Sequence, residues 1–131
     1  GPIDKIASGG ELARFLLALK VVLSANEPPK TLIFDEVDSG VGGAVAAAVG
    51  ARLARLGKKM QTLVITHSPQ VASNGDHHLK IEKYQSGEQM LSSTVSLSED
   101  ERLEEIARML AGDEITEAAR SAAAQLLKGD R

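Results

Sequence analysis

Thr31-Leu32-Ile33-Phe34-Asp35-Glu36 is one of two stretches that share a pattern, and Thr62-Leu63-Val64-Ile65-Thr66-His67 is the other. In each, a short unbroken apolar run stops abruptly at polar residues. Such a run, without polar alternation, is typical of a strand buried on both faces, as in a parallel sheet. The two stretches therefore predict neighbouring parallel strands.

The segment between these strands predicts the helix that connects them. Residues 44–56 place apolar side chains along one stripe, and Gly57 follows as a stop signal. That stripe contains Val45, Val49, Leu53 and Leu56. A strand, a helix and a second strand with a connection of this length form a βαβ unit, whose crossover is expected to be right-handed. The fold class is therefore α/β.

The flanking segments predict the remaining elements. Apolar residues at helical spacing predict a helix over 12–23, and a short helical or looped segment is expected over 69–73. Residues 76–83 and 90–97, with Gly87 at the turn, predict a β-hairpin. Ser98 and Glu101 form a capping-box pattern that opens a helix ending at Gly112. A last, alanine-rich helix is expected over about 116–128, more as cover for the core than as a partner-binding face.

The composition limits the class of protein. The chain has 131 residues, of which 43% are hydrophobic, 25% charged and 2% aromatic, so the core must consist mainly of aliphatic side chains. The absence of cysteine excludes disulfides and thiolate metal sites and fits a reducing cytoplasm. No apolar run approaches the roughly 18 residues that span a bilayer. A net charge of -3 gives no electrostatic case for nucleic-acid binding by this segment.

Candidate catalytic side chains follow the two strands. Asp35 and Glu36 end the first, which is the arrangement of a Walker B segment, where one acid helps hold Mg²⁺ and the next accepts a proton from water. His67 ends the second, on the same edge of a parallel sheet, where ligands bind. A neutral imidazole there can donate to a phosphate oxygen or to water. The alternative is that these residues only end their strands at the surface.

Two glycine-containing segments belong to the same candidate site. Ser8-Gly9-Gly10-Glu11 precedes the first predicted helix. Ser8 and Glu11 fit a capping box, while the glycines let an anion approach free amides at a helix start. The loop of residues 37–43 contains three glycines and Asp38, and is expected either to connect strand and helix or to carry function.

Taken in order, Ser8-Gly9-Gly10-Glu11, Leu32-Ile33-Phe34-Asp35-Glu36, Asp38 and His67 resemble the signature motif, Walker B segment, D-loop and switch histidine of ABC-type ATPases. Glu11 is typical of the SMC-like branch. The segments 5–12, 35–43, 66–72 and 104–110 are similar to the RecN-type DNA repair proteins, so the resemblance covers nearly the whole chain.

The resemblance implies a partial P-loop NTPase fold, in which residues 1–131 form the carboxy-terminal lobe of an ABC/SMC-type head. It implies that Asp35 helps coordinate Mg²⁺, that Glu36 is the general base and that His67 senses the γ-phosphate of ATP. It further implies that Ser8, Gly9, Gly10 and Glu11 contact nucleotide on a second head, and that Asp38 acts across that dimer interface.

No GxxxxGK[ST] phosphate loop occurs in the sequence. The resemblance places that loop in an amino-terminal lobe of the same protein, beyond a long coiled coil. ATP and Mg²⁺ are therefore expected to bind only with that lobe, and this chain alone is expected to be an inactive part of an ATPase. The implied setting is recombinational repair of DNA double-strand breaks in the bacterial cytoplasm, at the nucleoid, with DNA contacted through the full-length protein and no membrane partner.

Two other functions remain open on the sequence. One is a fragment of another SMC-like ATPase or of an ABC transporter, and the other is a docking module that does not hydrolyse ATP. A metal site at His77 and His78 is not favoured, because adjacent residues on a strand face opposite sides. A lobe without its partner is also expected to expose an apolar patch that promotes self-association.

Overall fold

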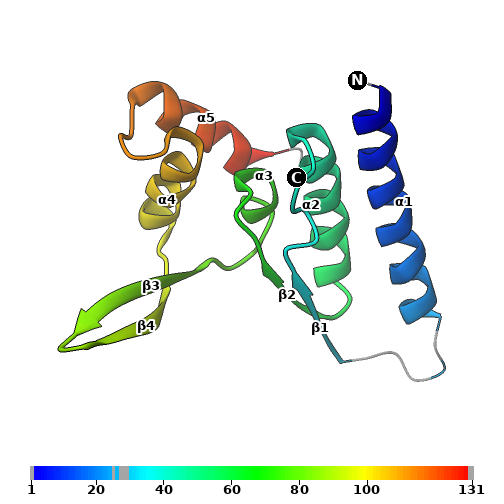
Figure 1. Ribbon diagram of the computed structural model, residues 1–131, viewed down its shortest axis with the longest axis horizontal. Coiled ribbons are helices and arrows are strands. Elements are labelled where there is room, and N and C mark those ends of the chain that lie inside the picture. The colour runs from blue at the N-terminus through cyan, green and yellow to red at the C-terminus, as the bar shows by residue number, and fades with distance from the viewer. Residues whose placement is uncertain (1, 25, 27–29, 130–131) are drawn as a thin grey trace. The chain divides into compact units, whose positions relative to one another are not determined.

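The computed structural model describes residues 2–24, 26 and 30–129, with the backbone alone for residues 2–11 (Figure 1). The chain divides into two compact units, Gly1–Asn74 and Gly75–Arg131. The elements that carry the candidate site all belong to the first unit. The prediction that residues 1–131 form one lobe stays a prediction.

The first unit is built on two parallel strands. Its elements are α1 (Pro2–Leu23), β1 (Thr31–Asp35), α2 (Gly43–Gly57), β2 (Gln61–Ile65) and α3 (Pro69–Ala72). Thr31 lies opposite Gln61 and Asp35 opposite Ile65, so β1 and β2 end at the same edge. The predicted parallel βαβ core is thereby confirmed, and Ser68 caps α3 by accepting a hydrogen bond from the Val71 amide at 3.3 Å.

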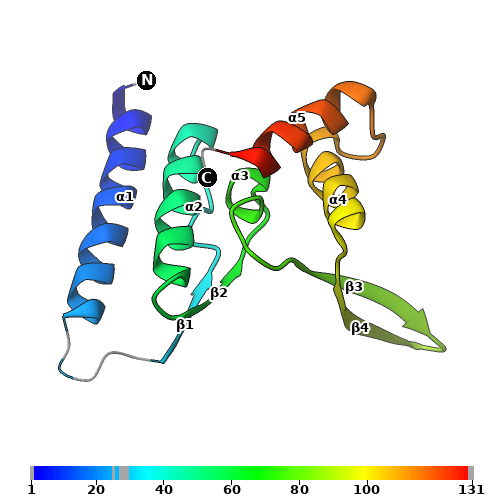
Figure 2. The ribbon, with the colours of Figure 1, turned by 180° about the vertical axis from the view of Figure 1, so that it is seen from behind.

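One face of this sheet is covered by helices. The core consists of Ala46, Val49, Leu53 and Val71, with side chains of α1, β1 and β2 packed against it. The rings of Phe15 on α1 and Phe34 on β1 meet edge to face, with centroids 5.5 Å apart. Both views show α1 and α2 side by side (Figures 1 and 2).

The prediction that both strands are buried on both faces is wrong. Burial alternates along β1 and β2, and Ile33, Leu63 and Ile65 are 65%, 45% and 49% exposed. The reason is that α1 and α2 pack on one face, and nothing in the described part of the chain buries the other. We call the face formed by Thr31, Ile33, Asp35, Gln61, Leu63 and Ile65 the outer sheet face.

The predicted start of the first helix is also wrong. α1 begins at Pro2 and continues through Ser8–Glu11, instead of starting after them. Proline suits a first helical turn because it has no amide hydrogen to satisfy. A glycine inside a helix costs about 1 kcal/mol relative to alanine, which the bonds of a continuous helix can offset.

The second unit contains β3 (Leu79–Ser86), β4 (Gln89–Ser96), α4 (Glu99–Ala111) and α5 (Glu117–Lys128). The two strands pair antiparallel, and Gly87 at the turn has a φ of 62° that favours glycine. The capping box of Ser98 and Glu101 is present. The predicted hairpin and both terminal helices are confirmed, with the strand ends shifted by up to three residues.

The last helix covers the core of the second unit, as predicted. Ala119 and Ala123 of α5 are buried, and so are Ile106 and Ala107 of α4. Small alanine side chains allow two helices to approach closely, which suits a chain with few aromatic residues. No helix in the described residues is both long and apolar enough to cross a membrane.

Candidate functional site

The side chains of Glu36 and His67 meet at the common edge of β1 and β2. Nε2 of His67 lies 2.8 Å from Oε1 of Glu36. The His67 side chain is 91% exposed and that of Glu36 45%. The structure therefore brings together an accessible carboxylate and an imidazole from two different strand ends, within the reach required for proton transfer.

The backbone of Glu36 has a special conformation. Its φ is 53°, the only positive φ of a described residue other than glycine. The Glu36 amide still donates to the carbonyl of Ile65 at 2.8 Å, and its carbonyl accepts from the Ser39 amide at 3.0 Å. Glu36 thus extends the parallel ladder by one bond and then turns the chain sharply. Left-handed backbone in a non-glycine residue costs of order 1 kcal/mol and is often found at functional sites.

Asp38 is buried inside the unit. It is 7% exposed, and its Oδ2 accepts a hydrogen bond of 2.6 Å from the Thr66 hydroxyl. Its Oδ1 is buried without a hydrogen bond from any described residue. Thr66 was predicted as the end of a strand and as part of the segment 66–72 that is similar to RecN-type proteins, but not as a site residue. Its place directly before His67 was the one sequence feature that could have marked it.

Asp35 lies at the end of β1 with an exposed side chain. The prediction that Asp35 helps to coordinate Mg²⁺ stays a prediction. Among the residues the structure describes, no group of three or more His, Cys, Asp or Glu side chains could hold a metal ion. Mg²⁺ is commonly held by one or two carboxylates together with water and nucleotide phosphates, so a single exposed carboxylate at this edge is compatible with such a site.

The candidate nucleotide contact Ser8-Gly9-Gly10-Glu11 lies within the backbone of α1, and its side chains lie outside the described residues. Because amides inside a helix bond to the preceding turn, a helix that begins at Pro2 does not present these four amides to an anion. The predicted free amides would require a helix that begins at Ser8.

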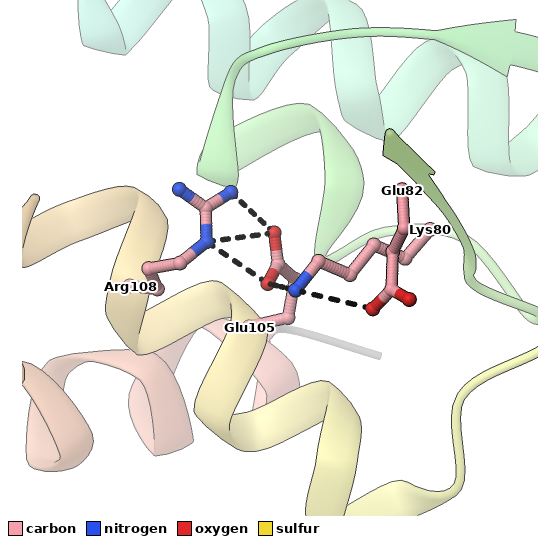
Figure 3. A network of polar contacts seen from close by, with 4 residues as sticks. All are labelled: Lys80, Glu82, Glu105 and Arg108. Atoms are coloured by element: carbon pink, nitrogen blue, oxygen red, sulfur yellow. Dashed lines mark hydrogen bonds and ion pairs between the residues drawn. The ribbon is translucent and has the colours of Figure 1, made fainter. Parts of the chain in front are cut away.

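A second polar cluster, which the sequence did not indicate, lies in the second unit (Figure 3). Glu105 of α4 is 7% exposed, and its Oε2 accepts from Nζ of Lys80 on β3 at 3.0 Å. Nε of Arg108 lies 3.0 Å from the same oxygen. The hydrogen bonds from Arg108 lower the pKa of the Glu105 carboxyl, although burial opposes this. The cluster fixes β3 to α4 within its unit.

His77 and His78 precede β3 and have different surroundings. His77 is exposed, while His78 is partly buried and its carbonyl accepts from the Leu97 amide at 3.0 Å. Burial lowers the pKa of the His78 imidazole, and the nearby charge of Arg102 lowers it further. The two histidines thus differ in environment, which makes them a matched pair for experiments.

The fold is similar to solved SMC ATPase heads. One similar chain, from work on ATP-driven dimerization and DNA-stimulated activation of SMC ATPases, superposes with a TM-score of 0.65 at 19% identity, covering 79% of this chain and 61% of that one. The Smc head domain with a coiled coil and joint from Pyrococcus yayanosii gives 0.52 at 24% identity, covering 61% and 15%. The fold is therefore that of part of an SMC-type head.

Within the class of SMC-type heads, the sequence comparisons identify the family. The chain is 48% identical to the DNA repair protein RecN of Streptomyces coelicolor over 130 residues, which are 99% of the chain and 23% of that protein. It is 49% identical to RecN of Deinococcus radiodurans over 129 residues, with 98% and 22% covered. The chain is a RecN-type sequence and corresponds to the carboxy-terminal portion of such proteins.

The chain spans less than a quarter of the length of the curated relatives it matches. No family model matches it.

Proposed function

We propose that this chain is part of the ATP-binding and hydrolysing head of a RecN-type protein that acts in recombinational repair of DNA double-strand breaks. The contact between Glu36 and His67 is the observation that carries the proposal. A carboxylate and an imidazole 2.8 Å apart, at one edge of a parallel sheet, are suited to handle a proton and a phosphate oxygen together.

Three side chains of this edge have proposed roles. Glu36 accepts the proton of the attacking water, and His67 donates a hydrogen bond to a γ-phosphate oxygen or to that water. Asp35 helps to hold Mg²⁺, directly or through a water molecule. Bound Mg²⁺ and ATP would supply the transferred phosphoryl group and the positive charge that stabilises it. The exposure of Glu36 and His67 supports these roles, since a reactant must reach both side chains.

The remainder of the head has to come from residues outside this chain. The sequence has no phosphate-loop motif, and the outer sheet face exposes Ile33, Leu63 and Ile65. We propose that the amino-terminal lobe of the same protein covers this face. The length of the relatives supports this occupant, because more than three quarters of each lies outside the matched portion. That lobe, joined through a coiled coil, would hold most of the nucleotide.

A second head is the other proposed partner. Ser8, Gly9, Gly10 and Glu11 would contact nucleotide held by that head, in a conformation where the helix begins at Ser8. DNA would be contacted through the full-length protein, since a net charge of -3 gives no electrostatic case for nucleic-acid binding by this portion. The proposed location is the bacterial cytoplasm at the nucleoid.

A chimera can test the proposal. This chain would replace the corresponding portion of the Deinococcus radiodurans relative, which is 49% identical. We expect the chimera to hydrolyse ATP, with stimulation by DNA. Glu36→Gln should lower the turnover at least about a hundredfold, the usual effect of losing a general base. Glu88→Gln, a matched change at an exposed hairpin residue, should leave the turnover unchanged.

The other outcomes are equally informative. Turnover without DNA stimulation would favour a general SMC-like or ABC-type ATPase. A folded chimera without turnover would favour a docking module and overturn the catalytic roles. The chain by itself should show no ATPase activity. Robust hydrolysis by the chain alone, abolished by Glu36→Gln, would contradict the need for a second lobe.

A further inference from the structure

We infer that Asp38 and Thr66 are positioning residues, which act from within this chain to hold His67 against Glu36. The resemblance to ABC-type ATPases instead assigns Asp38 a contact across a dimer interface. The catalytic consequence of this inference rests on the function proposed above, whereas the positioning itself concerns the geometry of the chain alone.

His67 is highly exposed, so its contact with Glu36 needs a physical explanation. A side chain that is 91% exposed has few neighbours to restrict its rotamers, and free rotation would keep the imidazole away from Glu36 most of the time. Packing of the ring itself therefore cannot maintain the 2.8 Å contact. A fixed backbone at His67 keeps the imidazole within reach of Glu36, and the bond between the two side chains then selects the rotamer that makes the contact.

The Thr66 hydroxyl fixes that backbone on both sides of His67. It donates to Oδ2 of Asp38 at 2.6 Å and accepts from the Ser68 amide at 2.9 Å. Ser68 in turn caps α3, whose Val71 is buried in the core. One oxygen atom thus ties the residues before and after His67 to each other and, through α3, to the packed interior.

Asp38 joins this turn to the loop that carries Glu36. Glu36 and Asp38 are two residues apart, and the Glu36 amide is itself bonded to the Ile65 carbonyl at 2.8 Å. Two links therefore connect the two loops below the catalytic pair: one between backbones, and one between the side chains of Asp38 and Thr66. With both links present, the spacing between Glu36 and His67 is set by a backbone hydrogen bond and by the buried Asp38 carboxylate.

The burial of Asp38 argues against a purely structural role. Its Oδ1 has no hydrogen bond from any described residue, and a buried acceptor left unsatisfied costs stability. A shorter or apolar residue would avoid that cost, yet it would lose the bond to Thr66. The carboxylate is therefore explained better by the geometry it imposes on the site than by the stability it adds.

The first test needs no nucleotide. In the 131-residue chain, a nuclear Overhauser effect between the Glu36 γ-protons and the His67 ring should be present. Thr66→Val removes the hydroxyl at nearly constant volume, so this effect should disappear and exchange of the Ser68 amide should accelerate at least about tenfold. Thr66→Ser retains the hydroxyl and should restore both. Persistence of the ring contact in Thr66→Val would overturn the inference.

Asp38→Asn provides a second variant if Thr66→Val fails to fold. The amide oxygen can still accept from Thr66, so the contact between Glu36 and His67 should survive, whereas Asp38→Ala should lose it. Loss of the contact between Glu36 and His67 in Asp38→Asn, together with its retention in Asp38→Ala, would also refute the inference. Exchange of the Leu63 amide, which lies within β2, serves as a control for general unfolding.

The chimera links the geometry to catalysis. Thr66→Val should lower kcat at least about tenfold with KM little changed, because a misplaced group affects the transition state more than nucleotide binding. Thr66→Ser should keep kcat near that of the parent chimera. An unchanged kcat in Thr66→Val would overturn the catalytic part of the inference. An inactive parent chimera would instead refute the proposed function, and the resonance measurements would still decide on the positioning.

Discussion

The amide of Glu36 donates to the carbonyl of Ile65 at 2.8 Å, although Glu36 has already left the extended conformation of β1. The last bond between the two parallel strands is thus made by a residue in the left-handed region. The turn is completed by the bond from Ser39 to the Glu36 carbonyl. A strained backbone therefore directs the Glu36 side chain toward His67, and this strain has a measurable cost.

Substitution of Glu36 should reveal that cost. Glu36→Gly and Glu36→Ala both remove the carboxylate, but only alanine keeps a Cβ at a φ of 53°. We expect Glu36→Gly to have a free energy of unfolding higher than that of Glu36→Ala by about 0.5–1 kcal/mol, after allowing for the entropy of unfolded glycine. The chain's two phenylalanines, Phe15 and Phe34, both lie in the first unit, so their near-ultraviolet circular dichroism during urea unfolding reports on it. Equal stability of the two variants would show that Glu36 is not strained.

Gly50 permits the close approach of α2 and α3. A Cβ added there would lie 3.0 Å from the Gln70 carbonyl oxygen and 3.2 Å from Cα of Val71, both backbone atoms. We expect Gly50→Ala to lower the free energy of unfolding by about 1–2 kcal/mol, since overpacking outweighs the better helix propensity of alanine. Gly57→Ala is the control, because a Cβ there meets nothing within 4 Å. A Gly50→Ala variant as stable as Gly57→Ala would show that the two helices can separate without cost.

Glu105 should stabilise the second unit at neutral pH and lose this effect in acid. Its bonds to Arg108 lower its pKa below 4.5, so its contribution is full above about pH 4.5 and declines as the pH falls through the lowered value. We expect Glu105→Gln to lower the free energy of unfolding by about 1–2 kcal/mol at pH 7. The substitution should also make the free energy of unfolding depend less on pH in the acid range. The fluorescence of Tyr84, the only tyrosine, reports on this unit during unfolding.

Glu104→Gln is the matched control for Glu105. Glu104 is bonded to Arg120 at the surface, where solvent screens such a pair and its contribution to stability is small. Some acid dependence should remain in both variants, because the Ser98 amide also lowers the pKa of Glu101. Identical pH profiles for Glu105→Gln and Glu104→Gln would contradict the stabilising role of the buried cluster.

His78 should act in a separate pH range. Burial lowers its pKa below 6.5, so the unfolded chain binds a proton more readily than the folded one, and stability declines as the pH falls below about 6.5. His78→Gln should remove this decline below about pH 6.5, as followed by Tyr84 fluorescence. The exposed neighbour provides the comparison, since His77→Gln should keep the wild-type profile. A decline that persists in His78→Gln would assign the effect to another group.

Much of the site followed from the sequence because it depends on local pattern. Apolar runs that end in Asp35 and in His67 fix which residues lie at the edge of a parallel sheet, and the register bears this out. Stop signals at Gly57, Gly87 and Gly112 likewise marked the ends of elements.

The errors arose where the outcome depends on three-dimensional context. Residues 31–35 have the same apolar pattern whether one or both faces are covered, so the sequence could not indicate that Ile33 is exposed. The start of α1 depends on whether a continuous helix offsets the cost of Gly9 and Gly10, a balance of a few kcal/mol. The bond between Asp38 and Thr66 spans 28 positions, and no local signal predicts such a contact.

The exposed outer sheet face leads to the last prediction, that the isolated chain self-associates. Ile33 and Ile65 lie on this face without cover from described residues, and burying an isoleucine side chain contributes about 1.5–3 kcal/mol. In sedimentation velocity the chain should associate with increasing concentration, and Ile33→Thr or Ile65→Thr should each weaken the association constant about tenfold or more. Threonine preserves strand propensity, so a loss of association would reflect apolar contact instead of unfolding. Ile81→Thr, at a 66% exposed position of the hairpin, separates the contribution of this face from that of the exposed apolar residues of the hairpin. If only Ile81→Thr weakened the association, the hairpin would be the contact surface. A wild-type chain that stays monomeric would contradict the prediction that the outer sheet face promotes self-association.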